Sequence, residues 1–191
     1  MEIIMLNKKN LSRTLGAAAI AVLFGASLAH AQSTDASNST GASQSQVSKK
    51  DRDYMADIAH ANLSEISAGQ MALQKSQNSD VKQFAQKMID DHTKAEDELK
   101  QLADAKGVTL PTEPDMKHKT EAKTMKMMSG NTFDKEYIKH GGVADHEATQ
   151  KLLQKVEKNA QDQDLKAYAA KTVQTVDEHL AMAKQLEQKV K

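Results

Sequence analysis

The chain has 191 residues, with 26 basic and 26 acidic side chains and therefore no formal net charge. This balance argues against a large nucleic-acid interface, which needs a basic face and aromatic stacking partners, and only 3% of the residues are aromatic. The absence of cysteine excludes disulfides, thiolate zinc sites, iron–sulfur clusters and thiol catalysis. Two prolines and eight glycines in a chain rich in Ala, Lys, Gln, Glu and Leu favour an all-α protein.

The first 31 residues have the pattern of a secretory signal peptide. Basic residues near the N-terminus precede an apolar run at 15–29, which ends in the small-x-small sequence Ala29-His30-Ala31. The run is shorter than the about 20 residues that span a bilayer, so a transmembrane anchor fits less well. We therefore expect cleavage after Ala31 and export to the periplasm or the outer membrane.

Two further segments follow the predicted signal peptide at 1–31. Residues 32–50 are rich in Ser, Thr, Gln and Asn, and this composition predicts a disordered polar linker. The composition changes sharply after it, and residues 51–191 have the length of a single domain. We expect this domain to be a helical bundle.

The domain contains four long amphipathic patterns, separated by turn residues and helix-ending residues. Short turns join the first helix to the second and the third to the fourth, so each pair is expected to form an antiparallel hairpin. This order predicts an all-α, ferritin-like antiparallel four-helix bundle with an extra short helix in the crossover between the two hairpins. We expect the long helices at about 53–77, 81–106, 132–159 and 164–190, and the short helix at about 115–128.

Two adjacent glycines interrupt the third predicted long helix. Gly141 and Gly142 each weaken a helix by roughly 1 kcal/mol relative to alanine. They therefore predict a kink or a close helix crossing beside His146.

One polar side chain on each predicted long helix interrupts the row of apolar residues that faces the other helices. His92 and His179 each continue a row whose members alternate in spacing between four and three residues. Glu65 and His146 lie on comparable rows of their own helices. Counting from the two turns places all four near the middle of the bundle, although His146 and His179 differ in height by roughly 5 Å.

A carboxylate and three neutral imidazoles that meet between helices suit Zn, Mn, Fe or Cu. The sequence thus predicts a site for a single transition metal formed by Glu65, His92, His146 and His179. A hydrogen-bonded polar layer that fixes helix register would explain the same four residues without a metal, and this alternative stays open.

An acidic residue precedes each of the three histidines. Asp91, Asp145 and Glu178 point about 100° away from the histidine that follows them, because they are its immediate neighbours on a helix. They are either surface ion-pair residues or hydrogen-bond partners of a histidine on a neighbouring helix.

The domain also resembles a known bacterial family over about residues 51–188. The similar family is domain of unknown function 4142, whose members are described as exported or outer-membrane proteins of ferritin-like fold. The resemblance implies a ferritin-like bundle behind a signal peptide, and it implies no established activity. It is carried by Glu65-x3-Gly69-x2-Ala72, Val81-x2-Phe84-Ala85-x2-Met88-x2-Asp91-His92, Gly107-x2-Leu110-Pro111, Phe133-Asp134-x2-Tyr137, Asp145-His146, Leu165-x3-Ala169 and His179-Leu180.

The resemblance to ferritin-like proteins does not extend to a di-iron centre. Such centres use a Glu-x-x-His motif on two of the four helices. The residues three before the histidines here are Ile89, Val143 and Val176, all of which are apolar. With one carboxylate among the four candidate ligands, no di-iron centre and no oxygen activation is expected.

The sequence favours an exported bundle of unknown biochemical activity that binds one transition metal. A non-catalytic role in the envelope or in stress is expected from the family context, with association with the envelope or membrane and a monomer or weak homo-oligomer. The alternative is a chaperone-like module for protein or membrane interaction, with a purely structural polar core. An oxidoreductase is the weakest hypothesis, because the bridging carboxylates of an oxygen-activating di-iron centre are missing. The sequence also shows no paired catalytic carboxylates, no Ser/His/Asp pattern and no phosphate-binding loop.

Overall fold

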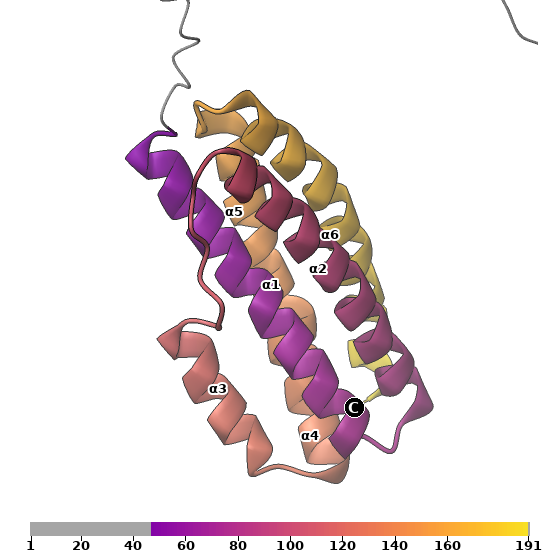
Figure 1. Ribbon diagram of the computed structural model, residues 1–191. Coiled ribbons are helices and arrows are strands. Elements are labelled where there is room, and N and C mark those ends of the chain that lie inside the picture. The colour runs from indigo at the N-terminus through magenta and orange to yellow at the C-terminus, as the bar shows by residue number, and fades with distance from the viewer. Residues whose placement is uncertain (1–46, 191) are drawn as a thin grey trace, which may run out of the picture. The chain divides into compact units, whose positions relative to one another are not determined.

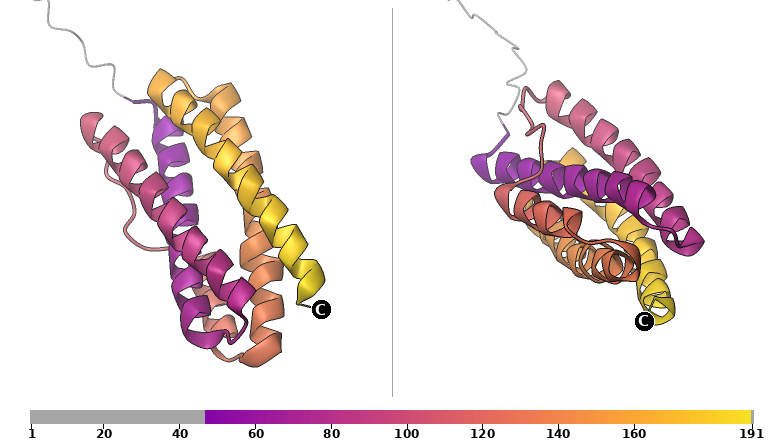
Figure 2. Two further views of the ribbon diagram at one scale, coloured as in Figure 1. Left: turned by 90° about the vertical axis from the view of Figure 1, so that its right-hand side faces the viewer. Right: turned by 90° about the horizontal axis from the view of Figure 1, so that it is seen from below.

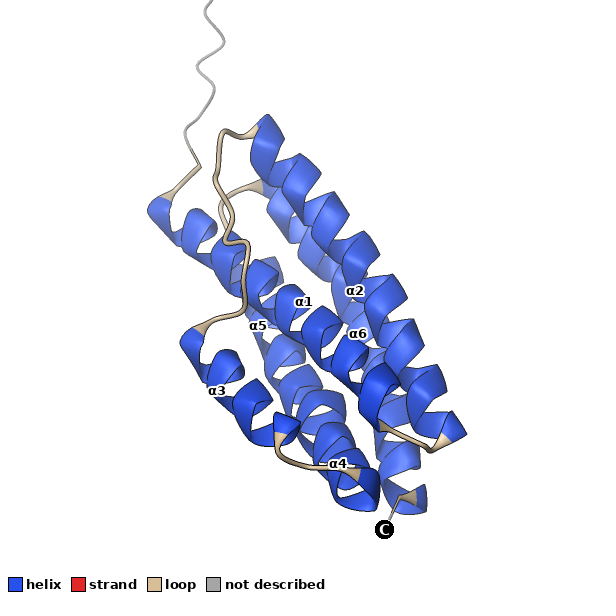
Figure 3. Ribbon diagram, turned by 60° about the horizontal axis from the view of Figure 1, so that its bottom comes forward, coloured by secondary structure: helices blue, strands red, loops and turns tan. Residues whose placement is uncertain are grey.

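The computed structural model describes residues 47–190, and this part of the chain is all-helical, with no strand (Figure 3). The all-α prediction is confirmed for these residues. The predicted signal peptide and most of the predicted linker lie outside the described residues. Within residues 47–190, no helix is long and apolar enough to cross a membrane. The helices are α1 (Lys49–Lys75), α2 (Ser79–Ala105), α3 (Met116–Lys126), α4 (Gly130–Tyr137), a π-helical segment η1 (Ile138–Ala144), α5 (Asp145–Asn159) and α6 (Gln163–Lys189).

The long helices pack as two antiparallel hairpins. α1 lies against α2, and α5 lies against α6 (Figure 1). Packing of α2 on α6 and of α1 on α5 joins the two hairpins (Figure 2). The short helix α3 lies in the connection between them and contacts α1 and α4 (Figure 3).

The first helix begins inside the segment that the sequence predicted as linker. Ser48 is its N-cap, and the Ser48 Oγ accepts a hydrogen bond of 3.0 Å from the backbone N–H of Asp51. Val47 is buried just before this cap. A serine that satisfies an unpaired N–H of the first turn starts the helix here, ahead of the first strongly apolar residues.

A buried carboxylate connects the start of α1 to the turn between α5 and α6. The Asp51 side chain accepts hydrogen bonds from the backbone N–H of Gln161, at 3.1 Å to each oxygen, and of Asp162, at 3.0 Å. Asp51 is only 1% exposed. It therefore joins the two hairpins at this end through charge-assisted hydrogen bonds.

The third predicted long helix, 132–159, is not a continuous α-helix in the structure. It consists of α4, the π-helical segment η1 and α5, and Gly141 and Gly142 lie within η1. In this segment the backbone N–H of Asp145 bonds to the carbonyl of His140, five residues back. A Cβ atom at Gly142 would lie 3.1 Å from the Cβ of Ala183 on α6. The glycines thus mark a close helix crossing, as expected, and the predicted kink takes the form of a π-helix.

A buried polar layer separates two apolar clusters in the interior. On α2, Met88 belongs to one cluster and Leu99 to the other, and the buried His92 lies between them. On α6, Val176 and Ala183 flank the buried His179 in the same way. The polar layer is therefore closed on both sides by apolar packing.

Replacing Asp51 by alanine should lower the free energy of unfolding by about 2–4 kcal/mol, because the N–H groups of Gln161 and Asp162 would lose a charged acceptor. Urea unfolding followed by circular dichroism measures this loss. The control is Asp53→Ala, which removes only an exposed ion pair with Lys49 and should cost less than about 1 kcal/mol. Equal losses in the two variants would contradict this account of Asp51.

Candidate metal centre

Three of the four predicted ligand residues come together between α2, α5 and α6. The ring centroids of His92 and His146 are 5.5 Å apart, and each is 5.4 Å from the ring of His179. One nitrogen from each ring lies within 4.8 Å of the others. All three side chains are buried. We call His92, His146 and His179 the histidine trio.

His92 is oriented by an asparagine on α1. The His92 Nδ1 lies 3.1 Å from the Oδ1 of Asn62, whose Nδ2 donates to the carboxylate of Glu96 at 3.1 Å. Because the Asn62 amide nitrogen is engaged with Glu96, its oxygen faces the imidazole and can only accept. The His92 Nδ1 therefore carries the proton, and its Nε2 has a free lone pair.

His146 is oriented by the π-helical segment. Its Nδ1 donates to the backbone carbonyl of Gly141 at 2.8 Å. A carbonyl oxygen can only accept, so the proton is on Nδ1 and the lone pair is on Nε2. That Nε2 lies 3.5 Å from the Nε2 of His92.

His179 is oriented by an aspartate on α2. Its Nε2 donates to the Oδ2 of Asp91 at 2.7 Å, and Lys87 donates to the same oxygen at 2.8 Å. Partial burial alone would raise the pKa of Asp91, but the hydrogen bonds from Lys87 and His179 outweigh it and lower that pKa. The remaining nitrogen of His179, Nδ1, is buried and has no hydrogen-bond partner among the described residues.

The three imidazoles are held as neutral bases. Burial is the main cause that lowers the pKa of each, and neighbouring imidazoles lower the pKa of His92 and His146 further. The pKa of His146 falls from its ordinary 6.5 to about 4. One nitrogen of each ring thus lies close to the other two, and neutral imidazoles oriented through their second nitrogen are what a metal ion requires.

Glu65 does not join the group of converging nitrogens. Its Oε1 lies 3.5 Å from the Nδ1 of His146, the protonated side of that ring, and neither of its oxygens has a hydrogen-bond partner among the described residues. Burial, reinforced by the negative charge of Asp145, raises the pKa of Glu65 well above its ordinary value. Burial thus favours the protonated form of Glu65, and its carboxyl group is not among the ligand atoms that converge, so the structure does not place it as the predicted fourth ligand.

The three acidic neighbours of the histidines have different surroundings. Asp91 bonds to His179 on the neighbouring helix, which is the partner role considered for it from the sequence. Asp145 faces α3, where Lys117 lies 3.5 Å from it. Glu178 is exposed. Asp145 and Glu178 therefore have no hydrogen bond to the trio among the described contacts.

A second, more open group lies beside α3. His118, Glu121 and Asp145 each offer one atom within 4.8 Å of the others. Lys117 already lies 3.5 Å from both carboxylates and neutralises part of their charge. This group is half-buried, so its carboxylates keep contact with solvent.

Sequence reasoning missed two of the groups that orient the trio. Asn62 lies on the same apolar-facing row of its helix as Glu65, and a buried asparagine on such a row is a usable signal. The carbonyl of Gly141 left no signal in the sequence, because its availability depends on the local π-helical hydrogen bonding.

These features define an all-helical protein with a buried cluster of three neutral histidines. Residues 36–186 match the family described as Domain of unknown function (DUF4142), and the chain belongs to that family. The resemblance inferred from the sequence motifs is thereby confirmed. No curated protein and no solved structure matches the chain.

The lowered histidine pKa values predict that the metal-free protein loses stability in mild acid. His146 has a pKa of about 4 in the folded state and 6.5 in the unfolded state. Its contribution to the free energy of unfolding is therefore complete above pH 6.5 and is lost as the pH falls toward 4. For His146 the loss is about 3 kcal/mol. The raised pKa of Glu65 acts with the opposite sign, since its folded state holds the proton more tightly.

The measurement is the pH dependence of urea unfolding for the metal-free wild type and for His146→Gln. Glu65 is present in both proteins, so the difference isolates the histidine. Between pH 4 and 6.5, the free energy of unfolding should rise with pH less steeply in the variant than in the wild type, by up to about 1.4 kcal/mol per pH unit. Identical slopes would show that His146 is not held as a neutral base.

Proposed function

We propose that the protein binds one transition-metal ion through His92 Nε2, His146 Nε2 and His179 Nδ1. The observation that carries the proposal is the convergence of three lone pairs, each set by a hydrogen bond on the other nitrogen of its ring. Metal-binding histidines have this arrangement, in which a carboxylate, carbonyl or amide group fixes the tautomer.

A purely structural polar layer accounts less well for the same contacts. Such a layer would give each buried nitrogen a hydrogen-bond partner, since an unpaired buried polar group costs about 1–3 kcal/mol. Instead, His179 Nδ1 has no partner among the described residues, and two bare nitrogens face each other at 3.5 Å. A bound cation would satisfy all three nitrogens at once.

The donor set narrows the choice of metal. Three imidazoles, with no thiolate and no carboxylate among the converging atoms, suit Zn, Cu or Fe better than Mn, which prefers oxygen ligands. A di-iron centre would need several bridging carboxylates in this layer. The Glu65 carboxyl group lies 3.5 Å from His146 Nδ1, which is on the protonated side of that ring.

The wider setting is part of the proposal. We infer a ferritin-like four-helix bundle with the extra helix α3 in the crossover, which the hairpin order and the family membership support. The N-terminal sequence supports export to the periplasm or outer membrane, and the family context supports a non-catalytic envelope or stress role. A monomer or weak homo-oligomer is expected.

A second candidate function is a module for protein or membrane interaction. Met116 and Met127 are large apolar residues that are 72% and 88% exposed, at the start and just after the end of α3. Flexible methionine side chains are common on binding surfaces. In this alternative the histidine trio serves only the fold.

Metal loading separates the two functions. The full chain, His92→Ala and His60→Ala are each incubated with Zn, Cu, Co or Fe, desalted, and analysed for bound metal. The wild type should retain one equivalent of at least one metal, His92→Ala should retain far less, and His60→Ala should match the wild type. His60 is a matched control because it contacts the backbone carbonyl of Glu113 and lies outside the trio.

Thermal unfolding provides a second readout. A ligand that binds only the folded state at 100 times its dissociation constant stabilises it by about 2.7 kcal/mol. The bound metal should therefore raise the melting temperature of the wild type and leave that of His92→Ala nearly unchanged. Equal metal content in wild type and His92→Ala would refute the proposal, and binding of lipid vesicles by the metal-free chain would favour the interaction module.

A further inference from the structure

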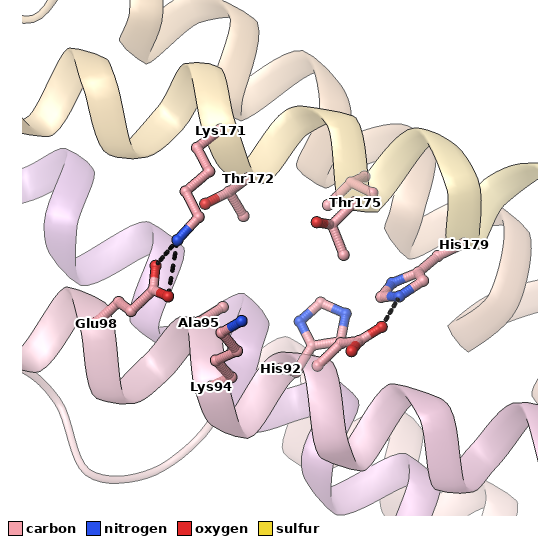
Figure 4. A pocket seen from close by; sticks show the side chains of 10 residues that line it. His92, Lys94, Ala95, Glu98, Lys171, Thr172, Thr175 and His179 are labelled. Atoms are coloured by element: carbon pink, nitrogen blue, oxygen red, sulfur yellow. Dashed lines mark hydrogen bonds and ion pairs between the residues drawn. The ribbon is translucent and has the colours of Figure 1, made fainter.

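A small pocket reaches the histidine trio from the surface between α2 and α6. Its volume is about 90 Å³, and Figure 4 shows the buried His92 and His179 at the opposite end of it from the Lys171–Glu98 ion pair. Ala95, Thr172 and Thr175 form part of its wall. His146 does not line the pocket, so the trio meets it on the side of His92 and His179.

Three histidine ligands leave a tetrahedral metal ion one ligand short. Structural zinc sites close all four positions with protein side chains, whereas sites that work on a small molecule keep one position for water or substrate. Glu65, the fourth predicted ligand, lies beside the protonated nitrogen of His146 and not among the converging atoms. The pocket is where an external ligand has access.

We propose that the metal bound by the trio keeps one exchangeable position, which faces this pocket and takes a small anion. This inference rests on the proposed function, since it requires the metal. It adds that the site is open to solution ligands and selects them by size and charge.

The size of the pocket limits the ligand. The pocket volume of about 90 Å³ is well below that of sites for drug-sized ligands, so the pocket suits a small anion rather than a large organic ligand. The Thr172 hydroxyl donates to the carbonyl of Tyr168 at 2.8 Å, which fixes that part of the wall. Thr175 lines the pocket and lies between Thr172 and His179 on α6 (Figure 4).

The charges around the pocket favour an anion. Three neutral imidazoles leave the charge of a divalent ion uncompensated, and the Asp91 carboxylate is already bonded to His179 and Lys87. Lys94 and Lys171 stand at the mouth. Lys171 forms an ion pair with Glu98 at 2.7 Å, and because its side chain is 65% exposed, this pair can separate to admit a ligand.

The test is a titration of the Cu(II)-loaded full chain with azide, a linear anion of three atoms, followed by visible absorption and electron paramagnetic resonance. In the wild type, azide should produce a saturable charge-transfer band and shift the copper spectrum with a stoichiometry of one. Thr175→Leu, which extends into the pocket, should weaken azide binding by about tenfold or more at equal copper content.

Two control variants test whether the larger side chain inside the pocket causes this loss of azide affinity. Thr175→Val keeps the volume of the side chain and removes only the hydroxyl, so its azide affinity should stay close to that of the wild type. Thr93→Leu makes the same change as Thr175→Leu at an exposed position of α2 that does not line the pocket, and it should leave the affinity unchanged.

Each contrary result has a distinct meaning. If copper binds through the trio and azide leaves its spectrum unchanged, the fourth position is closed; the inference fails and the proposed function stands. If Thr175→Leu binds azide as tightly as Thr93→Leu, the anion reaches the metal by another route and the inference fails. If wild type and His92→Ala hold the same amount of copper, the proposed function and the inference fail together.

Discussion

The arrangement of the core depends on three buried imidazole rings, each of which presents one nitrogen close to the nitrogens of the other two. A hydrogen bond from the other nitrogen of each ring fixes its orientation. The acceptor is an amide oxygen for His92, a main-chain carbonyl for His146 and a carboxylate for His179. The three acceptors come from three different elements, α1, η1 and α2. A shift of any of these elements would release one ring, so the orientation of the trio and the packing of the helices are coupled.

The apolar clusters on either side of this layer make the arrangement tolerable. They pack on either side of the imidazoles and supply the apolar burial that offsets the cost of the polar layer. The Asp51 carboxylate adds a polar connection at one end, where α1 meets the turn between α5 and α6. Buried atoms without a hydrogen-bond partner among the described residues occur in the polar layer, at His179 Nδ1, and also in the apolar clusters, at the hydroxyls of Tyr54 and Tyr137.

Helical periodicity was sufficient to predict the all-α class and the convergence of His92, His146 and His179. Both follow from the same alternating spacing, since residues that interrupt an apolar row must face the interior. Glu65 met the same criterion, yet spacing gives only the face of a helix and its approximate height, and it does not say which edge of the His146 ring a side chain meets. The start of α1 was missed because a serine cap acts through the backbone. The interruption at Gly141 and Gly142 was expected, but its π-helical form was not, because that form depends on backbone hydrogen bonding.

The π-helical segment sets how far α4 is rotated about the helix axis relative to α5. An α-helix turns about 100° per residue, so removing one residue from η1 and restoring regular α-geometry would rotate α4 by about that angle against α5. His146, on the α5 side, would keep its place in the layer, while Phe133 and Tyr137 would turn out of the apolar cluster that they share with Met88. The length of this segment therefore determines whether the third long helix can bury Phe133 and Tyr137 in the apolar cluster and His146 in the histidine layer at the same time.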